Sequence, residues 1–363
     1  MPRFMPGLEL SRRFYHQAVR PILDDAFPNL AHAAAHLGPG SDVLGLDTVM
    51  STDHGWYPTV RILLRDDDAA QSGAIHEALQ QRLPRLFAGF AVGTAESADE
   101  PAIFHMQPTT DGPVEHRVNI QTLRAWLWDH LRYDIDQPPH AADWLTFSSQ
   151  QLRELTAGAV HHDDLGDLTD LRRQFAWYPH DIWLYLLAAG WQRIGQEEHL
   201  MPRAGYVGDE LGSALIGSRL VRDVMNLCFL MEQQYAPYPK WFGTAFNQLR
   251  CSPELLPVLL RAQHATQWQE RETNMTTAYE YLARMHNVLG LTAPMRERVT
   301  DFFGRPFNVI FGGAFADALL AQIVDPHVRR IAARRPIGNV DQFSDSTDLH
   351  DVSWRSALRT FYT

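Results

Sequence analysis

The 363-residue sequence contains only two cysteines, Cys228 and Cys251, which are too few and too widely spaced for a disulfide framework or a zinc motif. No run of about 18 apolar residues occurs, so the sequence predicts no membrane-spanning helix. The first seven residues, Met1-Pro-Arg-Phe-Met-Pro-Gly, lack the apolar segment of a signal peptide. We therefore expect a cytoplasmic protein that does not associate with a membrane.

Positive charge is also scarce, because 32 Lys and Arg residues stand against 43 Asp and Glu residues and leave a net charge of −11. This balance argues against a protein that grips nucleic acid through its phosphates, so we expect no nucleic-acid partner. Internal repeats and low-complexity segments are missing as well. Hydrophobic residues make up 45% of the chain, and its length favours two globular domains. The sequence does not indicate an oligomeric state.

The hydrophobic period changes along the chain and indicates where the domains divide. Before about residue 121, helices are expected at 8–26 and 72–87, and strands at 31–37, 59–64, 103–107 and 114–120. Beyond this point the period stays near 3.6 residues. Helices are expected near 121–131, 148–161, 167–175, 179–199, 209–234, 253–264, 267–289, 294–301 and 313–323. The fold class expected is α+β, with a mixed-sheet domain at 1–135 and an all-helical domain at 136–363.

The segment 38–57 carries the most specific chemical signal. Gly40-Ser41 follows the expected strand 31–37, and Asp53 comes just before the next one. Glycine lets the backbone approach a triphosphate closely, and the Ser41 hydroxyl with nearby N–H groups can bind phosphate oxygens. An acidic residue at the start of the next strand can hold Mg²⁺. This order of residues is typical of a nucleotidyltransferase site.

The carboxylates of such a site are incomplete in this chain. Nucleotidyl transfer uses two or three acids, commonly spaced acid-x-acid so that both point to one face of a strand. Here the second position is Gly55. Glu115, in the expected strand 114–120, could supply a third acid, whereas Asn119 on the same face offers only a neutral carbonyl. Either Asp47, Asp53 and Glu115 form an altered metal site, or the site binds phosphate without transferring it.

Several long runs resemble a family of nucleotidyltransferase-like proteins of unknown function. These runs are Gly38-Pro-Gly-Ser-Asp-Val-Leu-Gly-Leu-Asp-Thr, Leu155-Thr-Ala-Gly-Ala-Val, Tyr178-Pro-His-Asp-Ile-Trp, Gly208-Asp-Glu-Leu-Gly-Ser, Tyr235-Ala-Pro-Tyr-Pro-Lys-Trp-Phe and Gly338-Asn-Val-Asp-Gln-Phe. The resemblance extends over nearly the whole chain. It implies Asp-His-Asp-Trp where this chain has Asp53-His-Gly-Trp, and a carboxylate near Asn119. The chain is therefore identified as a divergent member that has lost one or two acids.

The expected arrangement is also similar to the aminoglycoside nucleotidyltransferases, in which a helical domain closes over the substrate. That similarity implies that a lysine before an aromatic residue binds nucleotide phosphate, and Lys240 fits this description. Arg222 is a second candidate phosphate contact. A glutamate of the helical domain would act as general base, and Glu197, Glu198 and Glu210 are candidates among which the sequence does not decide.

The leading hypothesis is Mg²⁺-dependent transfer of a nucleotidyl group from ATP or another NTP to a small-molecule acceptor. Asp53 and Glu115 would ligate the metal, while Gly40, Ser41, Lys240 and Arg222 would bind the nucleotide. The first alternative is a degenerate or repurposed member that binds a nucleotide or small molecule, or catalyses a reaction without a nucleotide. The second is a metal-dependent phosphohydrolase built on His161-His-Asp-Asp164 and His180-Asp181. For these two groups helix termini are the stronger explanation.

Overall fold

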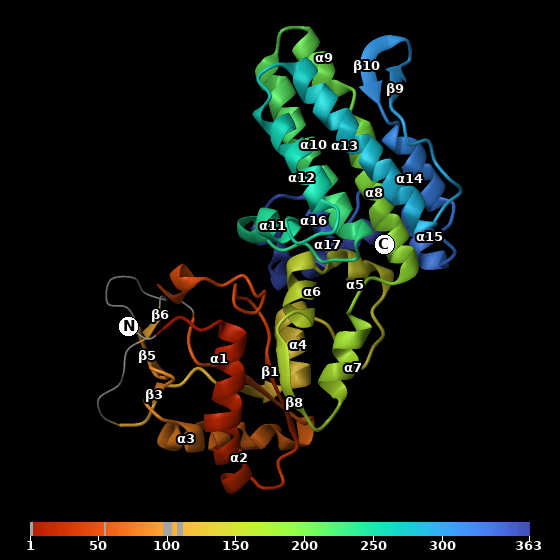
Figure 1. Ribbon diagram of the computed structural model, residues 1–363. Helices are drawn as coiled ribbons and strands as arrows, with labels where there is room; N and C mark the ends of the chain where they lie inside the picture. Colours follow the sequence, from red (N-terminus) through yellow and green to blue (C-terminus); the bar gives the residue numbers. More distant parts are fainter. Residues whose placement is uncertain (1–2, 54–55, 97–103, 107–111) are drawn as a thin grey trace. The chain divides into compact units, whose positions relative to one another are not determined.

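The computed structural model of the protein describes residues 3–53, 56–96, 104–106 and 112–363 (Figure 1). The chain forms two compact units. Unit 1 comprises Met1–Pro138 and Gln151–Ala176, and unit 2 comprises Pro139–Gln150 and Trp177–Thr363. Residues 151–176 therefore belong to the first unit, although the sequence places them in the helical domain. No helix among the described residues has the length and apolar character needed to cross a membrane.

Unit 1 is built on a four-stranded mixed sheet with the order β7-β2-β1-β8. The central strand β1 (His32–His36) pairs antiparallel with β2 (Arg61–Leu64) and with β8 (Ala159–Asp163). β2 pairs parallel with β7 (Asn119–Thr122). Every residue of β1 is buried, because helices and loops cover both faces of this strand. A strand buried on both faces needs no apolar–polar alternation, which explains its alanine-rich sequence.

A long amphipathic segment covers the core of unit 1, as the sequence predicts for residues 8–26. It consists of α1 (Gly7–Phe14), a π-helical segment Tyr15–Val19 and α2 (Arg20–Ala26). The widened π turn lies just before Pro21, whose ring would clash with a carbonyl of a regular α-helix. The buried side chains of the whole amphipathic segment pack with residues of β1, β2 and α3 (Ser72–Arg82) in one hydrophobic cluster.

The remaining elements of unit 1 are short. They are the 3₁₀ segments Val49–Asp53 and Asp66–Gln71, the strand pairs β3 (Leu86–Phe87) with β4 (Phe90–Ala91) and β5 (Thr94–Glu96) with β6 (Phe104–Met106), and the helices α4 (Leu123–Leu131) and α7 (Asp167–Gln174).

Three expectations for unit 1 are wrong. The expected helix 72–87 ends at Arg82, and Leu86–Phe87 form the strand β3. The expected strand 114–120 starts only at Asn119, and the expected helix 148–161 stops early: α6 (Ser149–Thr156) ends before β8. The chain turns at Gly158, which has a φ of +71°. Val160, His161 and His162 then complete the edge of the sheet beside β1. The helical period of the segment was real, but pairing with β1 overrides it.

Unit 2 is dominated by long helices. α8 (His180–Glu197) is its core, since every residue from Asp181 to Trp191 is buried. It packs against α10 (Glu210–Met231) and α14 (Gly312–Leu320). α13 (Trp268–Leu289) packs on α10 and on α12 (Ser252–His264), and Figure 1 shows these helices side by side. The sequence predicts these five helices.

Unit 2 also holds elements that the sequence does not predict. These are α5 (Ala141–Thr146), α9 (Leu200–Tyr206), α11 (Pro239–Phe246), α15 (Pro326–Ala332), α16 (Val340–Phe343), α17 (Arg355–Arg359), the 3₁₀ segments Thr347–His350, Val352–Trp354 and Thr360–Tyr362, and the hairpin of β9 (Thr300–Phe302) with β10 (Arg305–Val309). The hairpin corrects both the expected helix 294–301 and the all-helical assignment. Phe303 and Gly304 form its two-residue turn with positive φ angles.

A buried ion pair ties the end of the chain into unit 2. The Asp143 carboxylate in α5 lies 2.6 Å from the Arg355 guanidinium and 2.5 Å from that of Arg359. The Asp143 and Arg355 side chains are only 5% and 7% exposed, and Arg355 also lies over the Phe147 ring at 4.3 Å. Removing one member of such a pair leaves an uncompensated buried charge.

We expect Asp143→Asn to lower the free energy of unfolding by about 3–5 kcal/mol, because Arg355 would stay buried without its counter-charge. Chemical denaturation monitored by circular dichroism measures this loss. Asp317→Asn, at an exposed position of α14, is the control and should change stability by less than about 0.5 kcal/mol. Equal effects of the two substitutions would contradict a stabilising role of the buried pair.

Candidate functional site

The predicted phosphate-binding turn lies directly after β1 in unit 1. The backbone leaves the buried strand at His36 and passes through Gly38 and Gly40, whose φ angles are +104° and +149°. A Cβ on Gly40 would lie 2.2 Å from Oδ1 of Asp42, so no other residue fits there without a rearrangement. The two glycines are therefore required by the local conformation, whatever the turn binds.

After Gly40 the chain forms a single helical turn. The carbonyl of Gly40 accepts the N–H of Leu44 at 3.3 Å, and that of Ser41 accepts the N–H of Leu46 at 2.8 Å. Within the described part of the chain, no acceptor is recorded for the N–H groups of residues 41, 42 and 43. Successive N–H groups at the start of such a turn make a concave donor surface for an anion. The half-buried Ser41 lies at its entrance.

Contacts beneath the turn hold it in place. Nε2 of His36 lies 2.6 Å from Oδ2 of Asp42, and both residues are buried. The carbonyl of Val43 accepts the N–H of Gly158, at the start of β8, at 3.0 Å. A Cβ on Gly158 would lie 2.0 Å from the carbonyl oxygen of His36. Strand β8 thus fixes the position of the turn relative to β1.

We expect Gly158→Ala to destabilise unit 1 more than Gly166→Ala does. Both glycines have a φ slightly above +70°, but a Cβ on Gly166 would meet nothing within 4 Å. Gly166→Ala should cost about 1–2 kcal/mol for the left-handed conformation alone. Gly158→Ala adds the clash with His36, and thermal unfolding should show the larger loss. Similar losses would mean that β8 does not pack tightly on the turn.

The structure corrects the expected position of the acids. Asp53 ends the 3₁₀ segment Val49–Asp53, so its backbone does not begin a strand, and β2 starts only at Arg61. Gly55 lies outside the described residues. Oδ2 of Asp47 accepts the N–H of Gly7 at 2.8 Å and Nε1–H of Trp56 at 3.0 Å. Asp47 therefore anchors the beginning of α1.

The sequence predicts Glu115 and Asn119 on one face of a strand 114–120, and the structure does not place them so. Glu115 is exposed, precedes β7, and lies 3.5 Å from Nε2 of Gln80 in α3. Asn119 is exposed at the first residue of β7, and its amide donates to the carbonyl of Arg117 at 3.4 Å. The two residues therefore do not share one face of a strand 114–120. Among the described side chains, no group suited to a metal ion includes Glu115 or Asp47.

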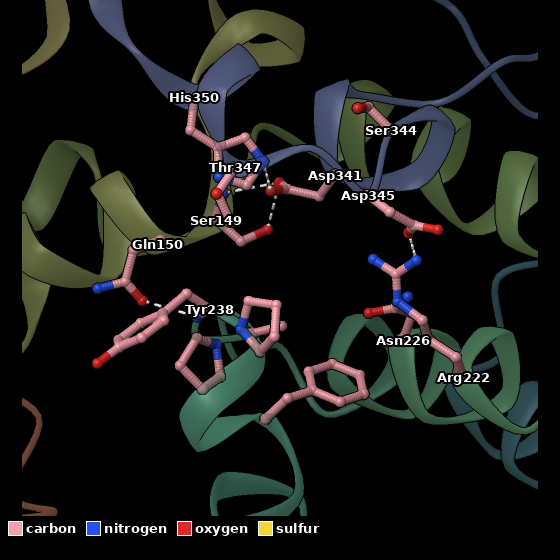
Figure 2. A pocket seen from close by; sticks show the side chains of 14 residues that line it. Ser149, Gln150, Arg222, Asn226, Tyr238, Asp341, Ser344, Asp345, Thr347 and His350 are labelled. Atoms are coloured by element: carbon pink, nitrogen blue, oxygen red, sulfur yellow. Dashed lines mark hydrogen bonds and ion pairs between the residues drawn. The ribbon is translucent and has the colours of Figure 1, made fainter.

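Unit 2 contains a pocket of about 180 Å³ that the sequence does not predict. The lining residues come from the start of α6, the middle of α10, the segment leading into α11 and the segment from α16 onward. They are Ser149, Gln150, Arg222, Asn226, Ala236, Pro237, Tyr238, Pro239, Phe242, Asp341, Ser344, Asp345, Thr347 and His350. Figure 2 shows Asp341 close to Ser149 and His350, and the Arg222–Asp345 pair apart from them.

Asp341 organises one side of this pocket. Its Oδ2 accepts the backbone N–H of Ser149 at 2.7 Å, the Ser149 hydroxyl at 2.8 Å and the side-chain amide of Asn339 at 3.1 Å. Its Oδ1 lies 3.3 Å from Nε2 of His350. The carboxylate thus caps the first residue of α6 and aligns the segments of the pocket wall.

Arg222 provides the cation on the other side. It pairs with Asp345, and the two side chains are 40% and 78% exposed. An ion pair this exposed contributes little to stability, so Asp345 can leave Arg222 at small cost. Burial of the Arg222 guanidinium lowers its pKa, and nearby Asp223 raises it. The position can therefore accept an anionic group of a ligand in place of the Asp345 carboxylate.

The other predicted site residues of unit 2 do not line this pocket. Lys240 is exposed at the start of α11, with Nζ 5.1 Å from the Trp241 ring centroid. Glu197 pairs with Arg219, and Glu210 accepts from the N–H of Trp268 and from Arg271.

Glu198 is buried and accepts the N–H groups of Ile310 at 2.6 Å and Gly312 at 3.0 Å. Burial raises the pKa of Glu198 to about 7, and these hydrogen bonds oppose the rise. Each candidate base is thus engaged in packing the helices of unit 2.

Three of the sequence runs that carry the family resemblance meet at the pocket. Tyr178 lies in a small adjoining cavity, the segment from Tyr235 supplies one wall, and Asn339 with Asp341 supplies another. The sequence signal for the pocket was therefore these runs themselves. Ser149, Asn226 and His350 had no such signal, because each is a polar residue in an ordinary helical or turn sequence.

Residues 144–242 match a family described as "Domain of unknown function (DUF4037)". The match includes the pocket residues from Ser149 to Phe242 and leaves out both the turn after β1 and the segment 341–350. No curated protein matches the chain. One similar solved structure is a nucleotidyltransferase-like protein from Exiguobacterium sibiricum 255-15. It is 11% identical, with 79% of this chain and 82% of that chain covered and a TM-score of 0.33.

Proposed function

We propose that the protein binds a nucleoside triphosphate with Mg²⁺ at the turn after β1 and transfers a nucleotidyl group to a small-molecule acceptor. The turn itself carries this proposal. It combines two glycines with positive φ angles, a serine hydroxyl and three successive N–H groups that have no acceptor among the described residues. These are the donors that a triphosphate needs, and they follow a rigid buried strand.

Asp53 is the proposed metal ligand, and Glu115 is a second proposed acid. Mg²⁺ would neutralise charge on the transferring phosphate and orient the acceptor oxygen. A specific observation favours a second candidate function, namely nucleotide binding without transfer. Gly55 replaces one acid, and Glu115 lies against Gln80 of α3. The two functions share the turn and differ in whether Asp53 has a partner carboxylate.

Calorimetric titration of the purified chain with ATP, in Mg²⁺ and then in EDTA, tests the turn. We expect saturable binding that Mg²⁺ strengthens, and Ser41→Ala should weaken it about 3–10-fold through loss of one hydrogen bond. Ser72→Ala, at the start of α3, is the control and should bind as the wild type does. If Ser41→Ala and wild type bound equally, the turn would not be the nucleotide site.

Asp53→Asn separates the two candidate functions. For a transferase, it should abolish the gain in affinity from Mg²⁺ while ATP still binds in EDTA. Asp67→Asn, at an exposed site in the 3₁₀ segment Asp66–Gln71, serves as control. Magnesium-independent binding by the wild type would support a binding protein without transfer. No binding of ATP in either buffer would exclude both functions.

We further propose Arg222 as a phosphate contact in the pocket of unit 2, with Asp345 occupying the place of the ligand anion. We expect Arg222→Gln to weaken the binding of inorganic triphosphate in this pocket about 10–100-fold, the value of a charge-assisted hydrogen bond. Asp345→Asn should strengthen binding, because it removes the competing carboxylate. Arg219→Gln, three residues earlier on α10, is the matched control. Equal effects of Arg219→Gln and Arg222→Gln would indicate only a general loss of positive charge.

A further inference from the structure

Unit 1 holds a group of metal-ligating side chains that the proposed function does not use. One ring nitrogen of His32, one of His162 and a carboxylate oxygen of Asp164 all lie within 4.8 Å of one another. His32 begins β1, His162 lies on β8, and Asp164 directly follows β8. His162 and Asp164 belong to the segment 161–164, for which the sequence favours a helix terminus, but the structure places it in and directly after β8. His32 is about 130 residues away in the sequence, so only the pairing of the strands brings it to them.

Strand register explains this convergence. Ala34 pairs with His162 and Ala33 with Asp163, and the N–H of Asp164 donates to the carbonyl of His32 at 3.2 Å. Asp164 therefore lies opposite His32 and two residues beyond His162, which places all three side chains on one face. A β-bulge shifts the register between Ala34 and Ala35, where β8 has an additional residue at His161.

Each histidine presents a nitrogen that suits a metal ion. Nδ1 of His32 lies 3.0 Å from the carbonyl of Leu30 and must carry the proton. Nε2 therefore accepts the Tyr15 hydroxyl at 3.0 Å, and a metal ion would displace this hydrogen bond. A backbone carbonyl on the far nitrogen is a common way to orient a metal-binding histidine.

His162 is already hydrogen-bonded to the third ligand. Its Nε2 lies 2.7 Å from Oδ2 of Asp164, and its Nδ1 lies 3.5 Å from a nitrogen of Arg20. Because a guanidinium only donates, the proton of the His162 ring belongs on Nε2, between the ring and the carboxylate. A divalent ion would take the place of this proton. His32 is buried and Asp164 is exposed, so the group is open to solvent on the Asp164 side.

We propose that His32, His162 and Asp164 bind a divalent transition-metal ion, with zinc as the ion of choice. Two imidazoles and one carboxylate form a typical three-ligand zinc set that leaves a fourth position for water. Mg²⁺ prefers an octahedron of oxygen ligands and should bind poorly here. The ion would join β1 to the edge strand β8. Arg20 opposes it by charge, although Arg20 also pairs with Asp24 at 3.5 Å.

Calorimetry and metal analysis on the EDTA-treated full chain test this site, with ZnCl₂, CoCl₂ and MgCl₂ as probes. We expect a single zinc ion per chain, a cobalt complex with visible absorption bands, and no comparable response to magnesium. Asp164→Asn and His162→Ala should each weaken zinc binding at least about tenfold. Asp164 is exposed, so its substitution should leave the fold intact, which circular dichroism verifies. The Arg20→Gln variant should bind zinc more tightly, because it lacks the positive charge that opposes the ion.

His16→Ala is the matched control, because His16 is an exposed histidine of the neighbouring Tyr15–Val19 segment. It should bind zinc as the wild type does. The site would be refuted if the wild type bound no zinc saturably, or if Asp164→Asn and His162→Ala bound it with unchanged affinity. Because the probe is the metal alone, its outcome is independent of the titrations with ATP.

Discussion

The constraint on which unit 1 depends is the complete burial of β1 between two neighbouring strands. Its middle residues are alanines, which let the strand be covered on both faces. At the end of β1 the chain turns through Gly38 and Gly40, whose φ angles are positive. The candidate phosphate site follows from this exit, and His32 at the other end of β1 brings in the candidate zinc site. The positions of both candidate sites are therefore set by the buried strand β1.

Much of the secondary structure could be predicted from the sequence, because its long helices have a clear period. The helix α8 and the strand β1 are examples, because the apolar residues that become buried are adjacent in the sequence and can be recognised there. The strand β8 could not be predicted, because its residues read as the continuation of a helix and only pairing with β1 makes them a strand. The β9–β10 hairpin depends on the positive φ of Phe303 and Gly304, which periodicity does not detect.

The candidate functional site was likewise only partly predictable from the sequence. The turn at Gly40 and Ser41 was predictable because its chemistry is contained in adjacent residues. The pocket of unit 2 was not, because Asp341 joins Ser149 and His350 across segments distant in the sequence. Asp341 lies in one of the runs that carry the family resemblance, but the run does not show that its carboxylate accepts three hydrogen bonds. Glu198 is the opposite case, because the sequence makes it a candidate general base and only the fold shows that its carboxylate is buried and accepts backbone N–H groups.

The acids decide what the turn after β1 can catalyse. A triphosphate needs N–H donors to bind, but it needs metal-bound carboxylates to react. Binding and transfer would thus make separate demands on the chain, and Gly55, where the family resemblance implies an acid, would affect only the second. Because the 3₁₀ segment Val49–Asp53 replaces the expected start of a strand, acid-x-acid spacing would not fix which side chains face a bound metal ion. A second carboxylate would then have to come from a different element than β2, and Glu115, before β7, is the candidate that the sequence offers.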